Sequence, residues 1–347
     1  MEPVNEKIIL VTGGTGYIGS HTSVELIEEG FEVMIIDNLC NSKADVVDRI
    51  HKITGVKPLL EVFDLCDRKK LNSFIQKHKD ISAVIHFAAF KAVGESVKKP
   101  LDYYRNNLLS LINLLEVMKC YRIPDLVFSS SCTVYGQPEK LPVTEDAPLQ
   151  PATSPYGNTK QIGEAIIRDT TISDKNVKAI SLRYFNPIGA HASSLIGELP
   201  EGVPENLVPY LTQTGIGIRE ELKVFGDDYD TPDGSCIRDY LHVVDLAKAH
   251  VIALKRLIEG KNKINYEVFN LGTGNGVSVL EAIKSFERVS GIKLKYKIVG
   301  RRAGDIEKIW ADPSYANREL GWRTLSSLDE AMKTAWDWEK AVRNNKL

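Results

Sequence analysis

The sequence has little of several features that would assign it to a specialised class of protein. Its 347 residues include only five cysteines, an odd number with no C-x-x-C pair, at Cys40, Cys66, Cys120, Cys132 and Cys236. Neither a disulfide framework nor a zinc knuckle is expected, and a reducing compartment is favoured. The net charge is only −2 and basic residues form no long cluster. Nothing in this charge distribution indicates a nucleic-acid partner.

Long hydrophobic runs are also missing. The apolar stretches are much shorter than the roughly 20 residues that cross a bilayer, and Met1–Lys7 is polar, unlike a signal peptide. Hydrophobic residues at 43% and charged residues at 26% are close to the globular average, which excludes a disordered or collagen-like chain. We therefore expect a soluble cytoplasmic protein with no membrane partner.

The chain instead alternates short β-branched runs with segments of helical period. Strands are expected at 7–12, 31–37, 59–63, 83–87, 126–129 and 177–184, and helices at 17–29, 44–53, 71–77, 101–121 and 156–169. This alternation predicts an α/β fold, a doubly wound parallel (Rossmann) sheet of six or more strands. After about Asn186, glycine and proline increase and the elements shorten. We expect a first domain over 1–185 and a second, smaller α/β substrate lobe over 186–347, and leave open whether later segments return to the first sheet.

A glycine-rich loop follows the first predicted strand. Gly13, Gly16 and Gly19 permit a tight turn, close approach of a pyrophosphate to the backbone, and packing of the next helix. Asp37 ends the second strand, 18 residues after Gly19, near the position of an acid that binds the adenosine ribose. A carboxylate there would repel a 2′-phosphate, so the sequence predicts NAD rather than NADP.

A phenol and an ammonium lie four residues apart in the fifth predicted helix. Tyr156 and Lys160 would occupy one helical face, about 6 Å apart along the axis. The preceding strand ends in a run of hydroxyls, Ser129 to Ser131, at the edge of the sheet where open α/β sheets bind ligands. Removing a hydride from a carbinol carbon requires a base for the hydroxyl proton. Tyr156 is suited to that role if the Lys160 cation stabilises its phenolate.

Together these motifs resemble the UDP-glucose (UDP-galactose) 4-epimerase family of extended short-chain dehydrogenases/reductases. The resemblance covers nearly the whole chain, from Ile8 to about Trp322, and rests on these segments: the Gly13-x-x-Gly16-x-x-Gly19 loop, Asp37-Asn38, His86 to Ala89, Lys91 to Ser96, Ser129 to Ser131, Tyr156-x-x-x-Lys160, Arg183 to Pro187, Arg238-Asp239-Tyr240 and Arg301-Arg302-x-Gly304-Asp305. Cys132 departs from the pattern, since the family usually has Ala there.

The resemblance implies a set of NAD-binding residues, in which Asn106 would hold nearby backbone: Gly13, Gly16, Tyr17, Ile18, Gly19, Asp37, Asn38, Asp64, Leu65, Phe87, Ala88, Lys91, Asn106, Ser129, Tyr156, Lys160, Tyr184 and Phe185. Catalysis would depend on Tyr156, Lys160 and Ser131. The substrate-binding set would be Lys91, Ser131, Thr133, Tyr156, Phe185, Asn186, Asn206, Leu207, Phe225, Arg238, Tyr240, Arg302, Asp305 and Ile309. No metal site is expected.

The implied activity is interconversion of UDP-glucose and UDP-galactose by transient oxidation at the sugar C4, with hydride return to either face. Guanidinium groups of Arg238 and Arg302 would suit the diphosphate. Ile309 would lie beside the sugar C2, where its size disfavours N-acetylated sugars. A homodimer would form through the helices at 101–121 and 156–169.

Two other readings remain open at this stage. A nucleotide-sugar 4,6-dehydratase shares the fold, the NAD and the Tyr–Lys pair, but it needs an Asp-Glu pair where this chain has Cys132 and Thr133. A non-catalytic NAD-binding regulator would be expected to lack the Tyr156–Lys160 pair, which this chain retains. Both are therefore disfavoured against the epimerase.

Overall fold

The computed structural model describes residues 7–302 and 305–344, which form two compact units. Unit 1 comprises the chain up to Gly136, Leu149–Arg183 and Ala247–Phe269. Unit 2 comprises Gln137–Pro148, Tyr184–Leu246 and the chain from Asn270. Relative to the expected division after residue 185, the later segment Ala247–Phe269 lies in unit 1, whereas the earlier segments Gln137–Pro148 and 184–185 lie in unit 2. Residues 1–6, which bear on the signal-peptide prediction, and Gly304 of the last motif lie outside the described residues.

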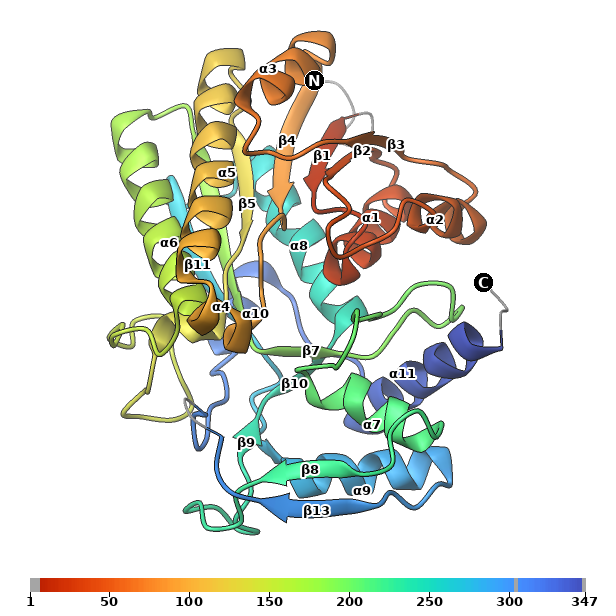
Figure 1. Ribbon diagram of the computed structural model, residues 1–347. Helices are drawn as coiled ribbons and strands as arrows, with labels where there is room; N and C mark the ends of the chain where they lie inside the picture. Colours follow the sequence, from red (N-terminus) through yellow and green to blue (C-terminus); the bar gives the residue numbers. More distant parts are fainter. Residues whose placement is uncertain (1–6, 303–304, 345–347) are drawn as a thin grey trace. The chain divides into compact units, whose positions relative to one another are not determined.

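Unit 1 is built on a seven-stranded sheet in the order β11-β6-β5-β4-β1-β2-β3 (Figure 1). The strands are β1 (Ile8–Thr12), β2 (Glu32–Asp37), β3 (Leu59–Val62), β4 (Ile81–His86), β5 (Asp125–Ser129), β6 (Lys178–Tyr184) and β11 (Tyr266–Leu271). From β6 to β3 every neighbouring pair is parallel. The predicted doubly wound fold is confirmed, and its strand order reverses at β1, which lies between β4 and β2.

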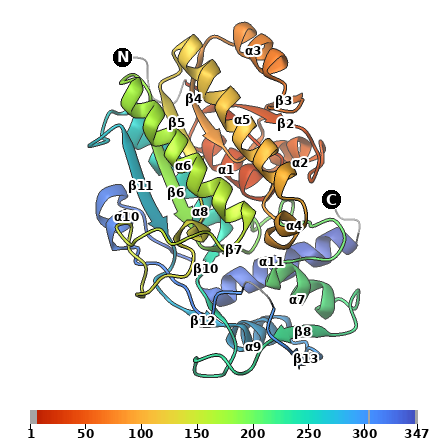
Figure 2. The ribbon, with the colours of Figure 1, turned by 60° about the vertical axis from the view of Figure 1, so that its left-hand side comes forward.

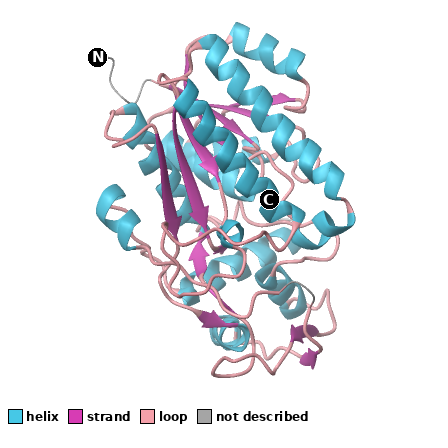
Figure 3. Cartoon of the chain, turned by 90° about the vertical axis from the view of Figure 1, so that its left-hand side faces the viewer, coloured by secondary structure: helices cyan, strands magenta, loops and turns pink. Residues whose placement is uncertain are grey.

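Helices cover both faces of this sheet (Figures 2 and 3). The helices of unit 1 are α1 (Tyr17–Glu28), α2 (Val46–Thr54), α3 (Arg68–Lys77), α4 (Val93–Lys98), α5 (Pro100–Tyr121), α6 (Pro155–Ser173) and most of α8 (Val243–Ile258). One core joins alternate strand residues such as Leu10 and Val84 to α3, α5 and α6. On the other face α1 and α8 are neighbours, linked by the Glu29–Lys255 ion pair.

Helix α6 is longer than its sequence period predicts. It starts one residue before Tyr156 because Ser154 caps it, accepting a hydrogen bond from Gly157 N–H at 3.1 Å, and Pro155 occupies the first helical position. The short helix α4 is not anticipated, since six residues carry too little periodicity to detect. The cap fixes the first turn of α6, where Tyr156 lies.

Unit 2 consists of short strands and helices, and it has a core of its own. Its elements are β7 (Asn186–Ile188), α7 (Leu207–Gly215), β8 (Leu222–Phe225), β9 (Ile237–Arg238), β10 (Tyr240–His242), β12 (Val277–Ser278), α9 (Val279–Ser290), β13 (Tyr296–Val299), α10 (Ser314–Leu320) and α11 (Leu328–Arg343). Strands pair as β10-β7, β12-β9 and β13-β8. Phe286 of α9 meets Trp336 of α11 edge to face, with ring centroids 5.5 Å apart. Among the described residues, no helix is both long and apolar enough to cross a membrane.

Candidate active site

The glycine-rich loop of unit 1 is packed too closely against backbone for side chains at Gly13 and Gly19. Gly13 has a φ of +71°, and a Cβ there would lie 2.7 Å from the backbone nitrogen of Ala88. A Cβ on Gly19 would lie 2.3 Å from the carbonyl oxygen of Gly13. The loop after β1 therefore touches the loop after β4, at the point where the strand order reverses. Open α/β sheets bind nucleotides at such a point.

The same loop presents the start of a helix to any ligand. Gly16 is the N-cap of α1 and supplies no side-chain hydrogen bond. The first N–H groups of a helix have no acceptor within the helix, and they attract anions together with the helix dipole. The loop from Gly13 to Gly19, with the first turn of α1, thus fits a pyrophosphate.

Asp37 is held beside this loop at the end of β2. Its carboxylate is buried and accepts hydrogen bonds from the N–H groups of Thr15, at 3.2 Å, and Leu39, at 2.9 Å. The next residue, Asn38, donates to the Asp64 carboxylate at 3.2 Å. The structure therefore brings together Asp37, Asn38 and Asp64, three residues predicted to contact NAD.

A residue that the sequence reasoning missed holds the backbone after β4. The amide of Asn107 accepts from Phe90 N–H at 2.8 Å and donates to Phe90 C=O at 3.0 Å. The amide of Asn106, which was expected to hold nearby backbone, donates to Asn107 Oδ1 at 2.9 Å. Helical periodicity could have shown that Asn107 and not Asn106 is the buried residue, because Tyr103, Asn107 and Leu111 form one buried face of α5.

The Tyr156–Lys160 pair lies against the end of β5. The Lys160 Nζ is 5.8 Å from the Tyr156 ring centroid and donates a hydrogen bond to the carbonyl of Ser129 at 2.5 Å. Ser131 follows two residues later and caps a short 3-10 helix (Cys132–Tyr135), its Oγ accepting from Thr133 N–H at 3.2 Å. The predicted catalytic residues therefore belong to adjoining segments, the first turns of α6 and the loop after β5.

Burial controls the ionisation of the groups around Lys160. Desolvation lowers the pKa of Lys160 to about 8, and the Glu164 carboxylate one turn further along α6 opposes that shift. Burial, with a smaller contribution from the Lys160 charge, lowers the pKa of His86 to about 3. His86 is therefore a neutral imidazole paired with Thr12 Oγ1 at 2.7 Å, and Lys160 is the group near Tyr156 that can carry positive charge.

One buried hydroxyl in this loop has unused hydrogen-bonding capacity. The Oγ1 of Thr133 is buried and makes no hydrogen bond with any described residue. Buried polar atoms in folded proteins are nearly always paired, by protein, water or ligand. Thr133 is predicted to lie beside the substrate, and its hydroxyl is available for that contact.

A cationic cluster occupies unit 2. Arg302 Nη2 bonds Asp305 Oδ1 at 2.7 Å, and Arg238 Nη2 lies 3.9 Å from the same oxygen. The Arg302 guanidinium is also 5.4 Å from the Phe225 ring centroid. Two guanidinium groups beside one carboxylate offer several N–H donors, which suits a diphosphate ligand.

The other predicted substrate-binding residues of unit 2 lie in its strands and loops. Ile309 is buried, and its N–H donates to the Ile237 carbonyl at 3.2 Å, which places it beside the backbone of Arg238. Asn186 is the register partner of buried Tyr240 in the β7/β10 pair. The Asn206 amide donates to the Glu198 carboxylate at 2.8 Å, at the residue before α7 begins with Leu207.

Asp239 is a second residue whose role the sequence alone did not predict. Its carboxylate accepts from the N–H groups of Thr273 at 2.8 Å, Gly274 at 3.2 Å and Ala311 at 3.1 Å. Burial raises its pKa even though these bonds oppose the shift. Asp239 thus anchors two distant loops directly beside Arg238, and no local signal in the sequence identifies such partners.

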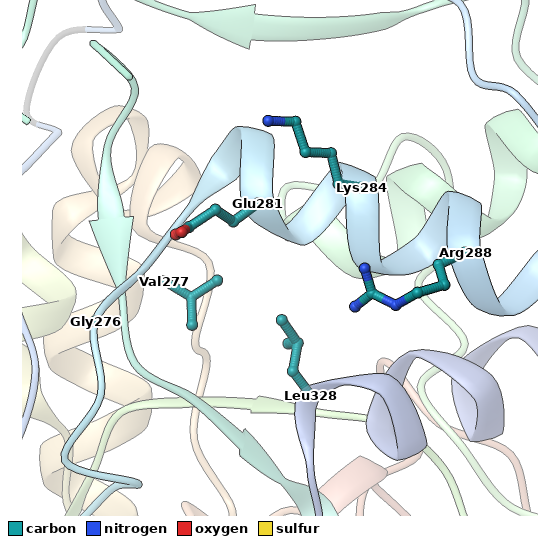
Figure 4. Close-up of a pocket in the computed structure, with 6 residues that line it drawn as sticks. All are labelled: Gly276, Val277, Glu281, Lys284, Arg288 and Leu328. Carbon is teal, nitrogen blue, oxygen red and sulfur yellow. The ribbon is translucent and has the colours of Figure 1, made fainter. Parts of the chain in front are cut away.

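A surface pocket in unit 2 offers no comparable chemistry (Figure 4). It is lined by Gly276, Val277, Glu281, Lys284, Arg288 and Leu328. Glu281 is engaged in the capping box of α9, and Arg288 pairs with Asp329 at 2.7 Å. The Glu281 carboxylate and the Arg288 guanidinium are thus already bonded at the ends of helices.

The fold, the glycine loop and the Tyr156–Lys160 pair define an extended short-chain dehydrogenase/reductase. A family model described as GDP-mannose 4,6 dehydratase matches residues 10–335. Curated UDP-glucose 4-epimerases are more specific relatives. The protein of Bos taurus is 50% identical over 338 residues, 96% of each chain, and that of Bacillus subtilis (strain 168) is 50% identical over 336 residues, 97% of this chain and 98% of the relative.

Solved structures agree with this assignment. The UDP-glucose 4-epimerase from Bifidobacterium longum, in complex with NAD+ and UDP, superimposes with a TM-score of 0.93 at 45% identity and covers 97% of this chain and 99% of its own. Within the broader dehydratase-type family, the chain belongs to the UDP-glucose 4-epimerases.

Proposed function

We propose that this protein interconverts UDP-glucose and UDP-galactose as an NAD-dependent 4-epimerase. The observation that carries the proposal is the buried Tyr156–Lys160 pair beside Ser131, in a chain half identical to UDP-glucose 4-epimerases over nearly its full length. Unit 1 is assigned the cofactor and the chemistry, and unit 2 the UDP moiety.

The residues of unit 1 fit NAD. The Gly13–Gly19 cradle would hold the pyrophosphate, and the Asp37 carboxylate would accept hydrogen bonds from the adenosine ribose. When bound, NAD supplies the hydride acceptor and donor for the sugar C4 carbon. Neighbouring structures are described with NAD bound, which supports this assignment.

Proton transfer is assigned to the side chains around α6. Tyr156 Oη takes the proton of the C4 hydroxyl as a phenolate, which the Lys160 ammonium stabilises. Ser131 Oγ binds the same substrate oxygen, and the unpaired Thr133 hydroxyl contacts the sugar. Hydride return to either face of C4 requires that the sugar turn over while the UDP stays bound.

The UDP end is assigned to the cluster of Arg238, Arg302 and Asp305 with Phe225. Asp305 keeps the two guanidinium groups near one another before the diphosphate arrives. Lys91 is assigned to both cofactor and substrate, and its Nζ lies 5.9 Å from the Tyr17 ring centroid in unit 1. The same binding residues are available to a 4,6-dehydratase, but that reaction needs acid–base residues where this chain has Cys132 and Thr133.

We also propose a cytoplasmic homodimer that pairs through α5 and α6. The five cysteines are free thiols, which fits a reducing compartment. Large apolar side chains are exposed on these helices, including Leu101 at 72% and Leu109 at 39% on α5 and Ile172 at 61% on α6. Light scattering should give twice the chain mass, and Leu109→Arg should give a monomer. A monomeric wild type would contradict the proposal.

Incubation with UDP-galactose and chromatographic separation of the products tests the function directly. We expect UDP-glucose to form without added oxidant, and a Tyr156→Phe variant to retain NAD but lose about 10²- to 10⁴-fold in rate. A 4-keto-6-deoxy product would identify a dehydratase, and unchanged substrate would identify a non-catalytic binding protein. Wild-type-like turnover by Tyr156→Phe would refute the assigned base.

A further inference from the structure

A buried ion pair lies beneath the loop that carries Ser131. Glu164 of α6 accepts two hydrogen bonds from Arg183 of β6, from Nε at 2.9 Å and from Nη2 at 2.6 Å. Each side chain is only 6% exposed. Bidentate pairing fixes both the separation and the orientation of the two groups.

The pair extends to both ends of the Ser131 segment. At one end, Ser130 Oγ donates to Glu164 Oε1 at 2.5 Å, and Ser130 is fully buried. At the other end, Arg183 Nη1 donates to Tyr135 Oη at 2.9 Å, with the guanidinium 4.9 Å from the Tyr135 ring centroid. Residues 130 and 135 bracket the hydroxyls of Ser131 and Thr133.

Stability alone is a poor reason for this arrangement. Removing two charges from water costs several kcal/mol per ion, and buried pairs are often no better than apolar side chains of equal volume. What a bidentate pair does supply is a single geometry. Here that geometry is transmitted to the residues immediately adjoining Ser131.

We infer that Glu164 and Arg183 are positioning residues for Ser131, which hold the segment from Ser130 to Tyr135 so that the Ser131 hydroxyl meets the reacting oxygen. The inference rests on the proposed function, in which Ser131 binds the C4 oxygen. Misplacement of a reacting group by about 1 Å costs on the order of 10²-fold in rate. Loss of the pair should therefore lower kcat and leave the KM for the UDP-sugar, which unit 2 is assigned to bind, nearly unchanged.

Unit 1 contains a matched control pair. Arg256 of α8 donates to Glu267 of β11 at 2.7 and 2.9 Å, with side chains 9% and 2% exposed. This pair has the same chemistry and burial but adjoins none of the proposed catalytic residues. Glu267→Gln thus reports the cost of unpairing a buried arginine by itself.

The experiment compares Glu164→Gln with Glu267→Gln in melting temperature, bound NAD, kcat and KM, per mole of folded protein. Both variants should melt lower. Glu164→Gln should lose about 10- to 100-fold in kcat with KM within about threefold of wild type, whereas Glu267→Gln should keep kcat within about twofold. Equal kcat in the two variants would overturn the inference.

A double-mutant cycle separates positioning from general damage. If Glu164 acts through Ser131, the Glu164→Gln change should have little further effect on kcat in a Ser131→Ala background, within about twofold. Multiplication of the two single effects would overturn the inference.

Should Glu164→Gln fail to fold, Ser130→Ala replaces it. Its control is Ser181→Ala, a fully buried strand serine whose Oγ accepts from Tyr266 at 3.0 Å. We expect about a fivefold loss or more of kcat for Ser130→Ala only, and equal kcat in the two serine variants would overturn the inference. Wild type and Tyr156→Phe are assayed first, so that failure of the proposed function appears there, whereas failure of this inference appears only in the positioning variants.

Discussion

A buried carboxylate at the first residue of β5 makes the stability of this protein depend on pH. Asp125 is 6% exposed, and its Oδ1 accepts no hydrogen bond from any described residue. Burial raises the pKa of Asp125 from 3.8 to about 6, although Lys178 and Lys7 oppose the shift. The folded protein therefore binds a proton at Asp125 more tightly than the unfolded chain does.

The sign and size of the effect follow from linkage. Because the folded-state pKa is the higher one, the stability contributed by protonated Asp125 is fully present below about pH 4 and is lost as the pH rises through about 6. A shift of about 2 units is worth about 3 kcal/mol. Between pH 7.5 and pH 5, about 1.4 kcal/mol of this is recovered. Asp125→Asn should therefore raise the free energy of unfolding at pH 7.5. The increase over wild type should be about 1.4 kcal/mol smaller at pH 5 than at pH 7.5.

Urea unfolding of wild type and Asp125→Asn at both pH values measures this difference. A matched control is Asp169→Asn on α6, where the carboxylate is 69% exposed and its removal should leave the pH dependence as in wild type. If the stabilities of Asp125→Asn and wild type changed in parallel between pH 5 and 7.5, the assignment of a raised pKa to Asp125 would be refuted.

Three further changes test the cofactor loop and the substrate range. Gly19→Ala should reduce the NAD retained after gel filtration, because its Cβ would lie 2.3 Å from a backbone oxygen. Gly16→Ala should have a milder effect, because its Cβ would lie 3.2 Å from the nearest backbone oxygen. Equal NAD retention in the two variants would contradict the packing argument. Asp37→Ala should weaken NAD binding and relax the exclusion of NADP, measured by titration of the apoprotein with each cofactor, and unchanged discrimination would show that the carboxylate does not read the ribose. The wild type should strongly prefer UDP-galactose to UDP-N-acetylgalactosamine, and Ile309→Gly should raise relative kcat/KM for the latter by roughly 10- to 200-fold, or about 1–3 kcal/mol. Comparable kcat/KM for both sugars in the wild type would exclude Ile309 as the determinant.

Short-range spacing in the sequence was enough to predict the framework of the site. The alternation of apolar strands and helices predicted the doubly wound sheet, and the three-residue spacing of Gly13, Gly16 and Gly19 indicated a pyrophosphate-binding loop. Tyr156 and Lys160 could be paired because residues four apart in a helix share a face. Each of these inferences depends on geometry that repeats within one or two turns of chain.

The remaining parts of the site depend on which strands become neighbours. Glu164 meets Arg183 only because α6 packs beside β6, and Asp239 anchors Ala311 from 72 residues away. Helical phase can place Asn107 on the buried face of α5, but only the tertiary structure supplies the partners of its amide, Phe90 and Thr159.

Local sequence thus determined the elements and the reactive side chains that they carry, because backbone dihedral preferences and side-chain periodicity act over a few residues. Tertiary structure alone decided the partners that hold those side chains in place. Partners are selected when the sheet assembles, since a buried polar group must find its hydrogen bonds wherever the packing of the core brings a donor or acceptor within reach.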